Sequence, residues 1–204
     1  MKVDCAFNKG FSHDICQDYT TIYNPDEYIQ MILCDGCSSS ENTDFGARIL
    51  ANIFSNRLFN FNEKQIINIL KLISSEFNLD YSFLDSTLLT AFYENNKIIL
   101  RYWGDGFIIQ KYKNYYNIQE INYENNYPFY FSYLLDGKKF ENYKKINKEC
   151  KFKLIETIID NQFLEKNIEI QFYNYKDCYS LINVSDDFEY IAFISDGLNS
   201  FIEK

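Results

Sequence analysis

Several residue types are scarce in this 204-residue sequence, and their scarcity excludes whole classes of protein. Two prolines and seven glycines are too few for a collagen-like, proline-rich or glycine-rich low-complexity chain. The single histidine, His13, leaves Ser-His-Asp and Cys-His catalysis with only one available base. Lys and Arg number 20 against 29 Asp and Glu, and the resulting charge of −9 disfavours binding to nucleic acids or anionic membranes.

Long apolar segments are also absent. No run approaches the roughly 18 consecutive apolar residues of a membrane-spanning helix, and the first residues do not have the pattern of a secretory signal. We therefore expect a cytoplasmic protein whose six cysteines are reduced thiols. The sequence is 47% hydrophobic and 19% aromatic, which supports a folded core. Its length and even composition predict a single domain over residues 1–204.

The order of apolar patterns predicts an α+β fold. Strand-like segments bounded by turn residues lie at 2–8, 18–23, 28–34, 87–93, 97–103, 107–112, 115–121, 129–134, 168–173 and 190–194. Helical spacing of apolar residues predicts helices at 45–58, 63–77 and 150–163, the second capped by Asn62. The polar region 136–150 has no assignment. This order favours a sandwich in which helices cover antiparallel sheets.

Acidic residues at predicted strand ends are the clearest functional signal. Asp-Gly occurs at Asp35-Gly36, Asp105-Gly106 and Asp196-Gly197, and Asp18 begins another strand. A single Asp-Gly would indicate only a turn. Several carboxylates gathered at one sheet edge repel each other unless a cation neutralises them, and hard oxygen ligands suit Mg²⁺ or Mn²⁺. The repeated pattern therefore favours a divalent-metal site.

Five short motifs follow one another along residues 10–200. They are Ser12-His13 with Cys16-Gln17-Asp18, Asp35-Gly36-Cys37-Ser38-Ser39 with Asp44-Phe45-Gly46-Ala47-Arg48, Ser86-Thr87-Leu88, Gly104-Asp105-Gly106, and Ser195-Asp196-Gly197-Leu198. In order and spacing they resemble the motifs of metal-dependent serine/threonine protein phosphatases of type 2C, particularly the bacterial branch. Each motif is weak alone, whereas five in order are a more specific signal.

The resemblance implies a four-layer αββα sandwich with two Mn²⁺ or Mg²⁺ ions at one sheet edge and a weaker third ion. It implies that Asp35 bridges the two ions, that the Gly36 carbonyl binds one of them and that Asp196 binds the other. Asp18 would hold a metal-bound water, and Asp105 would help Asp196 to hold the third ion. The implied reaction is hydrolysis of phosphoserine or phosphothreonine in proteins by a metal-activated water. The implied partners are a phosphorylated protein substrate and a serine/threonine kinase or the target of one.

Two further residues of the first motif are candidate site residues, and both depart from the family pattern. His13 is a candidate phosphate-binding group or general acid, at a position where the family commonly has Arg. Gln17 is a candidate contact in the metal shell, where many members have Glu. Cys37 and Ser38 also replace the small residue and glycine that usually follow Asp-Gly.

The acidic C-terminal strand of the family is the fourth departure, because the sequence ends at Lys204 soon after the last motif. Either the chain is a shortened variant or truncated, or an earlier residue such as Asp186 or Asp187 supplies the carboxylate. The rival hypothesis is therefore a catalytically impaired pseudophosphatase that binds a phosphoprotein or a kinase without turnover.

A second alternative concerns the cysteines. Cys34 and Cys37 form a C-x-x-C, which together with Cys16 and His13 would suit a zinc or redox site. Cys34 also fits a buried strand position, and the sequence contains no second C-x-x-C. The enclosed Asp-Gly is better explained by the metal-bridging motif.

Other polar residues have plain structural interpretations. Ser86 and Thr87 are expected in the core of a sheet and not among the reacting groups. The lysine pairs Lys138-Lys139 and Lys144-Lys145 indicate a solvated face, with docking of an acidic or phosphorylated partner as the alternative.

Overall fold

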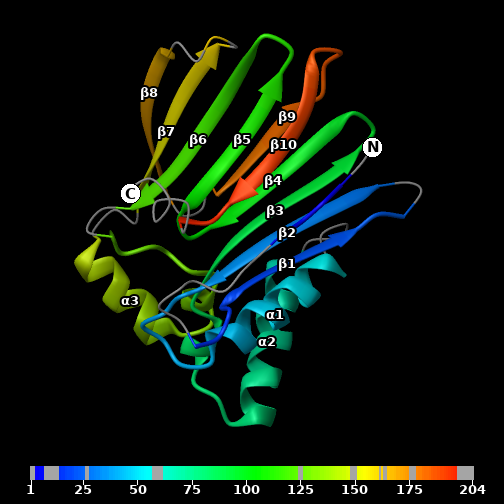
Figure 1. Ribbon diagram of the computed structural model, residues 1–204. Coiled ribbons are helices and arrows are strands. Elements are labelled where there is room, and N and C mark those ends of the chain that lie inside the picture. Colours follow the sequence, from blue (N-terminus) through cyan, green and yellow to red (C-terminus); the bar gives the residue numbers. More distant parts are fainter. Residues whose placement is uncertain are drawn as a thin grey trace.

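A computed structural model describes residues 3–6, 14–25, 28–56, 62–123, 126–147, 151–160, 162, 165–174 and 178–196. Within them the chain forms two five-stranded antiparallel sheets and three α-helices (Figure 1). The α+β class predicted from the sequence is confirmed. No helix in this part of the chain is long and apolar enough to cross a membrane.

The first sheet has the strand order β1-β2-β3-β4-β9. Its strands are β1 (Asp18–Tyr23), β2 (Ile29–Gly36), β3 (Ser86–Glu94), β4 (Lys97–Trp103) and β9 (Tyr179–Asn183). The turn between β3 and β4 has positive φ angles at Asn95 and Asn96, as a tight hairpin with a primed turn requires. The first four strands match the predicted ones closely. The sequence did not indicate β9, which forms by pairing with β4.

The second sheet has the order β10-β5-β6-β7-β8. Its strands are β5 (Gly106–Tyr112), β6 (Tyr115–Tyr123), β7 (Lys151–Asp160), β8 (Glu165–Asn174) and β10 (Phe188–Ile194). β10 pairs with β5, so this late segment joins the sheet beside one of its earliest strands. β9 and β10, which are consecutive in the chain, thus extend different sheets (Figure 1).

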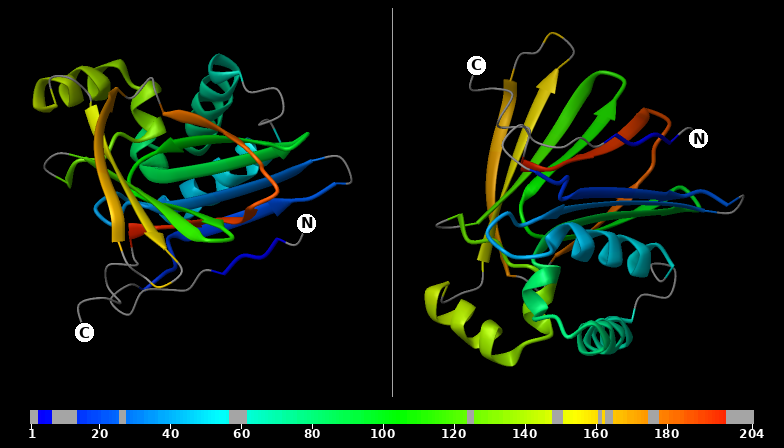
Figure 2. Two further views of the ribbon diagram at one scale, coloured as in Figure 1. Left: turned by 90° about the horizontal axis from the view of Figure 1, so that it is seen from above. Right: turned by 60° about the horizontal axis from the view of Figure 1, so that its bottom comes forward.

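Two helices cover the outer face of the first sheet. Helix α1 (Thr43–Ser55) packs on β1, β2 and β3, and α2 (Glu63–Phe77) lies beyond it, as Figure 2 shows. The Asn62 side chain accepts a hydrogen bond from Gln65 N at 3.2 Å, which confirms the predicted cap. Gly46 allows α1 to approach the 3-10 helix that contains Phe83, because a Cβ at position 46 would lie 1.6 Å from Phe83 O.

Helix α3 (Gly137–Ile146) occupies part of the polar region that had no assignment. Asp136 caps it, accepting from Lys138 N at 2.8 Å and Lys139 N at 3.3 Å. The helix packs beside the 3-10 helix η3 (Phe131–Leu134), which itself contacts β3 and the 3-10 helix η1 (Tyr81–Leu84).

Three sequence predictions of secondary structure differ from the structure. The helix predicted at 150–163 is wrong, because Lys151–Asp160 is strand β7 and pairs on both sides with β6 and β8. Its apolar residues suit either periodicity, and pairing decides between them. The strand predicted at 129–134 is also wrong, because Phe131–Leu134 is a 3-10 helix buried in the core. For the strand predicted at 2–8, residues 3–6 are not in a strand, and the other positions lie outside the described residues.

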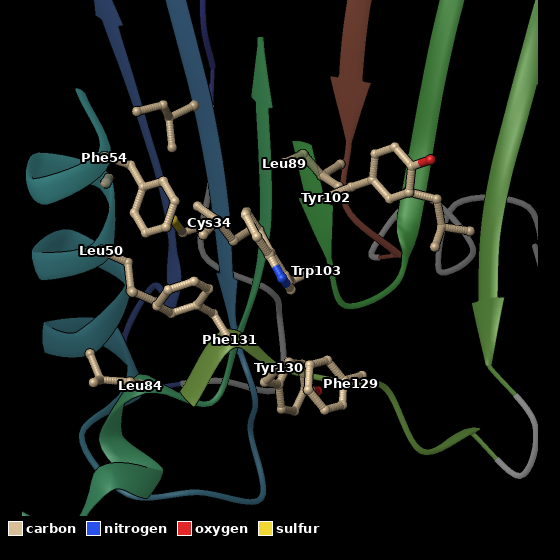
Figure 3. Packing of buried hydrophobic residues seen from close by; sticks show 14 of the residues in the cluster. Cys34, Leu50, Phe54, Leu84, Leu89, Tyr102, Trp103, Phe129, Tyr130 and Phe131 are labelled. Atoms are coloured by element: carbon tan, nitrogen blue, oxygen red, sulfur yellow. The ribbon is translucent and has the colours of Figure 1, made fainter. Parts of the chain in front are cut away.

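One part of the buried core lies between the first sheet and the helices (Figure 3). Phe54 of α1 packs edge-to-face on Trp103 of β4 and on Phe131 of η3, with ring centroids 5.7 and 5.3 Å apart. Cys34 and Leu50 lie beside them and are completely buried. Burial of each large apolar side chain contributes about 2 kcal/mol, so this cluster fixes α1 and η3 against the sheet.

Three of the four layers that the resemblance implies are present in the described residues. They are the helical layer of α1 and α2 and the two sheets. Helix α3 lies at the end of the second sheet beside η3, and no described helix crosses the outer face of that sheet (Figures 1 and 2).

Candidate functional site

Strand pairing places two of the predicted aspartates opposite each other. Asp18 begins β1 and Asp35 lies near the end of β2, and the antiparallel register pairs them directly. Paired residues share a face of the sheet, with Cβ atoms roughly 5 Å apart. Because Cys34 faces the helices and successive side chains alternate, Asp35 faces the second sheet.

The other two aspartates lie in a connection between the two sheets and at the end of a strand of the second sheet. Asp105 lies in the turn between β4 and β5, and Asp196 follows the end of β10. The two segments meet because β10 pairs with β5, Ile194 lying opposite Phe107. Gly104 makes this turn possible, since its φ is +83° and a Cβ would lie 2.6 Å from Thr87 Oγ1.

Electrostatic interactions confirm that these carboxyl groups lie close together. Burial raises the pKa of Asp35 to about 9, and the neighbouring Asp18 and Asp196 carboxyls add to this shift by charge repulsion and by hydrogen bonding to its neutral form. Burial likewise raises the pKa of Asp105, with a further contribution from Asp196. The four predicted aspartates thus form one group, in which Asp35 and Asp105 each interact with Asp196.

The arrangement differs from a formed metal site. In the part of the chain that the structure describes, no three His, Cys, Asp or Glu side chains are placed as a group that could hold a metal ion. Asp35 instead lies near enough to the Asp18 and Asp196 carboxyls for them to add to the effect of burial in raising its pKa. The structure therefore shows a convergence of carboxyl groups, and the metal ligands assigned to this group from the sequence stay predictions.

Hydrogen bonds from β3 fix two of the aspartates. Ser86 Oγ donates to Asp35 O at 2.9 Å, and Thr87 Oγ1 donates to the Asp105 carboxylate at 3.0 Å. Both hydroxyl residues are buried, as expected for core positions. Their hydroxyl groups also position the site, a role that the sequence interpretation did not give them.

The segment after Asp35 is also tied to its surroundings. Gly36 N donates to Gln17 O at 3.1 Å, and Thr43 Oγ1 donates to Cys37 O at 3.1 Å. The Gln17 side chain donates to Thr43 Oγ1 at 2.9 Å. Gln17 therefore contacts Gly36 through its backbone and Thr43, the first residue of α1, through its side chain, and its predicted contact in a metal shell stays untested.

Of the other acidic or basic candidates, Asp186 and Asp187 lie away from this edge. His13 lies outside the described residues. Asp187 precedes β10, whereas Asp196 follows it, so the length of that strand separates them. Asp187 pairs there with Lys113 at 3.0 Å, at the turn between β5 and β6. Neither Asp187 nor the adjacent Asp186 can replace a carboxylate at the group around Asp35.

The described cysteines do not support the zinc or redox alternative. Cys34 is completely buried, and burial, with the adjacent Asp35, raises the pKa of its thiol. Cys37 Sγ lies 3.1 Å from Ser39 Oγ, and Cys16 Sγ donates to Asp18 O at 3.6 Å. These three thiols are free and contact different partners, so they do not form a shared ligand group.

Two residues near the site have roles that no motif indicated. Asp85 immediately precedes β3 and is 5% exposed, although it carries a carboxyl group. Tyr130 is also buried, and burial, with contributions from the nearby Cys37 and Asp105, raises the pKa of its hydroxyl. The available signal for Asp85 was its position, because it is a charged residue between the apolar Leu84 and the start of a predicted strand. For Tyr130 there was no such signal, because residues 129–134 have the pattern of a strand.

Comparison with known proteins supports the fold. No family model matches the sequence, and no curated protein matches it. The solved structure of serine/threonine phosphatase Stp1 from Staphylococcus aureus matches over 97% of this chain and 76% of that chain, with a TM-score of 0.52 and 14% identity. A bacterial serine phosphatase matches over 97% and 78%, with a TM-score of 0.52 and 14% identity. A point variant of a bacterial serine phosphatase matches over 95% and 77%, with a TM-score of 0.55 and 13% identity.

The chain has the fold of bacterial serine/threonine phosphatases of type 2C. This agrees with the resemblance found in the sequence motifs, over nearly the whole chain. The magnesium complex of RsbX matches less well, over 67% of this chain and 82% of that chain, with 12% identity and a TM-score of 0.38. Identities this low establish the fold alone, and the activity is argued from the site below.

Proposed function

We propose that the protein hydrolyses phosphoserine or phosphothreonine in proteins with the help of bound Mn²⁺ or Mg²⁺. The observation that carries this proposal is the convergence of Asp18, Asp35, Asp105 and Asp196 at one end of the two sheets. They come from four separate segments, so the fold and not a local turn brings them together. The phosphatase fold supports the same reaction.

The residues present suit divalent cations. Carboxylate and carbonyl oxygens are the ligands that Mg²⁺ and Mn²⁺ prefer, and a cation would relieve the repulsion that adds to burial in raising the pKa of Asp35. Asp35, the Gly36 carbonyl and Asp196 would hold two ions, and Asp105 with Asp196 would hold a weaker third. Such ions would supply an activated water and would neutralise charge on the phosphoryl group.

The remaining residues act by position. Asp18 would accept a hydrogen bond from the attacking water, and its position opposite Asp35 supports this role. Ser86 and Thr87 hold the Asp35 backbone and the Asp105 carboxylate in place. The chain carries a charge of −9, so metal ions would have to provide much of the attraction for a phosphate group. The proposed partners are a phosphorylated protein and a serine/threonine kinase or its target.

A second candidate function is a pseudophosphatase that binds a phosphoprotein or a kinase without turnover. One observation favours it, namely that the described side chains include no group of three placed to hold a metal ion. The position of Asp187, paired with Lys113 away from the site, removes one possible replacement ligand. A carboxylate set that binds cations weakly would preserve the fold and lose the reaction.

The two functions differ in turnover of a phosphothreonine peptide with and without Mn²⁺. We expect Mn²⁺-dependent release of phosphate by the unaltered chain and none by Asp35→Asn. Asp187→Asn is the matched control, because it removes a carboxylate elsewhere, and it should retain full activity. No turnover by the folded chain at saturating Mn²⁺ would reject the phosphatase and favour the binding-only function.

A further inference from the structure

The Asp85 carboxylate joins three segments that are distant in sequence. It stands between η1 and β3 and is buried. One oxygen, Oδ2, accepts from Ser40 Oγ at 3.1 Å and from Lys139 Nζ at 2.8 Å. The other, Oδ1, accepts from Ser132 Oγ at 2.5 Å and from Lys139 Nζ at 3.2 Å. These four hydrogen bonds occupy both oxygens of the carboxylate and hold it in one orientation.

On one side, Asp85 holds the loop that follows Asp35-Gly36. Its backbone carbonyl accepts from Cys37 N at 2.9 Å, while its side chain accepts from Ser40 Oγ. Ser40 N in turn donates to Cys37 O at 3.1 Å, which closes the loop on itself. Asp85 therefore holds the loop at Cys37, one residue beyond Gly36, and again at Ser40.

On the other side, Asp85 holds η3 and α3. Ser132 lies in η3, and Lys139 lies in the first turns of α3. The Lys139 side chain is 31% exposed and that of Asp85 is 7% exposed, so the ion pair is largely withdrawn from water. Lys139 also lies 5.5 Å from the centre of the Tyr133 ring. The expectation that Lys139 belongs to a solvated face is wrong for this lysine.

We propose that Asp85 is a positioning residue for the metal site, which couples the place of the Gly36 carbonyl to the docking of α3. This inference rests on the proposed metal-dependent function. If the Lys139 ammonium is removed, the buried Asp85 carboxylate depends on its remaining hydrogen-bond donors. One of these donors, Ser40, belongs to the loop after Gly36. Movement of that loop displaces Gly36, and groups that position a metal ligand control the affinity of the site.

The coupling is reciprocal. If docking of α3 favours the cation-binding position of Gly36, then a bound cation must favour docking of α3 by the same factor. The ion pair of Lys139 with Asp85 is the contact through which each end acts on the other. The occupied site therefore stabilises α3, although the structure gives α3 no residue among the four aspartates.

The experiment compares Ser40→Ala, Lys139→Met and Asp85→Asn by calorimetric titration with Mn²⁺. We expect Ser40→Ala and Lys139→Met to weaken Mn²⁺ binding by about tenfold. Lys144→Met is the matched control: it removes a lysine of the same helix whose partner is the exposed Glu141 at 2.8 Å, and it should leave the affinity unchanged. Ser40→Ala keeps the buried ion pair, so it reports on the loop even if Asp85→Asn fails to fold.

Amide hydrogen exchange without metal gives a second, independent reading. We expect the amides of Cys37 and Ser40 to exchange faster in Lys139→Met than in the unaltered chain, whereas Lys144→Met changes neither. Unchanged exchange at both amides would overturn the inference, and so would faster exchange combined with unchanged Mn²⁺ affinity. If the unaltered chain binds no Mn²⁺, the proposed function fails and the positioning role fails with it; the exchange data then show separately whether the loop is coupled to α3.

Discussion

The two sheets contain equal numbers of antiparallel strands but are buried to different degrees. In the first sheet, β3 is buried from Ser86 to Phe92, with α1 and η3 on one side and the second sheet on the other. In the second sheet, β6 is half-buried along most of its length, and no described helix crosses its outer face. Burial of apolar surface is the main stabilising contribution. The first sheet should therefore carry most of the stability, with the aspartates gathered where the two sheets meet.

The largest expected effect is a cavity in the well-buried half. Phe54→Ala removes a completely buried ring that contacts Trp103 and Phe131. We expect a loss of about 3–5 kcal/mol in the free energy of unfolding. Ile118→Ala in β6 removes a half-buried side chain and should cost about 1 kcal/mol. Urea denaturation measures both, and equal losses would show that the second sheet is as well packed as the first.

The next effect tests the place where the sheets meet. At a Mn²⁺ concentration about 100-fold above Kd, binding should stabilise the unaltered chain by about 2.7 kcal/mol, and Asp35→Asn should abolish this gain. Without metal, the same substitution should be neutral or stabilising, because it removes a carboxyl group that faces Asp18 and Asp196. Thermal unfolding with Mn²⁺ and with a chelator separates the two effects. A destabilised metal-free variant would contradict the repulsion.

The pH dependence of the metal-free protein has a definite sign. Asp35 has its pKa raised from an ordinary 3.8 to about 9 in the folded state. Its contribution to stability is therefore complete below pH 3.8 and is lost as the pH rises through about 9. Asp105, whose pKa is also raised, contributes in the same direction. We expect the stability gained by Asp35→Asn to grow over this range, which a pH series of unfolding curves would measure.

The fold was predictable where local pattern and tertiary pairing agree. β1 and β4 match the predicted residues, and so does α2 with its Asn62 cap. The prediction failed for Lys151–Asp160, where apolar residues fit a helix or a strand and the neighbours β6 and β8 decide. It failed also for β9, a short strand that exists only through its pairing with β4.

The convergence of the four aspartates was predictable because they stand in short motifs at strand ends, while their role in binding metal stays a prediction. The sequence identified Asp18, Asp35, Asp105 and Asp196, and the structure brings these four together. Residues that support them from outside the motifs were missed. Asp85 meets Ser40, 45 residues away, and Lys139, 54 residues away, and no local pattern indicates contacts over such separations.

A smaller effect is expected inside the first sheet. Thr87→Val removes the hydroxyl that donates to Asp105 at 3.0 Å and leaves that buried carboxyl with one donor fewer. We expect a loss of about 1–2 kcal/mol in stability and a higher pKa for Asp105. Thr90→Val is the matched control on the same strand, since its hydroxyl donates to Arg101 O at 3.3 Å. Thr87→Val should also weaken Mn²⁺ binding more than Thr90→Val does. If its effect on the Mn²⁺ affinity is instead smaller than that of Thr90→Val, Thr87 does not support the site.

The smallest expected effect lies at the opposite end of the second sheet. Lys113 and Asp187 form an ion pair whose side chains are 56% and 67% exposed, and exposed pairs contribute less than about 1 kcal/mol. Asp187→Asn should therefore change the midpoint of urea unfolding very little and the Mn²⁺ affinity not at all. Loss of Mn²⁺ binding in this variant would mean that Asp187 reaches the group around Asp35. The two ends of β10 would then have to lie closer together than an extended strand allows.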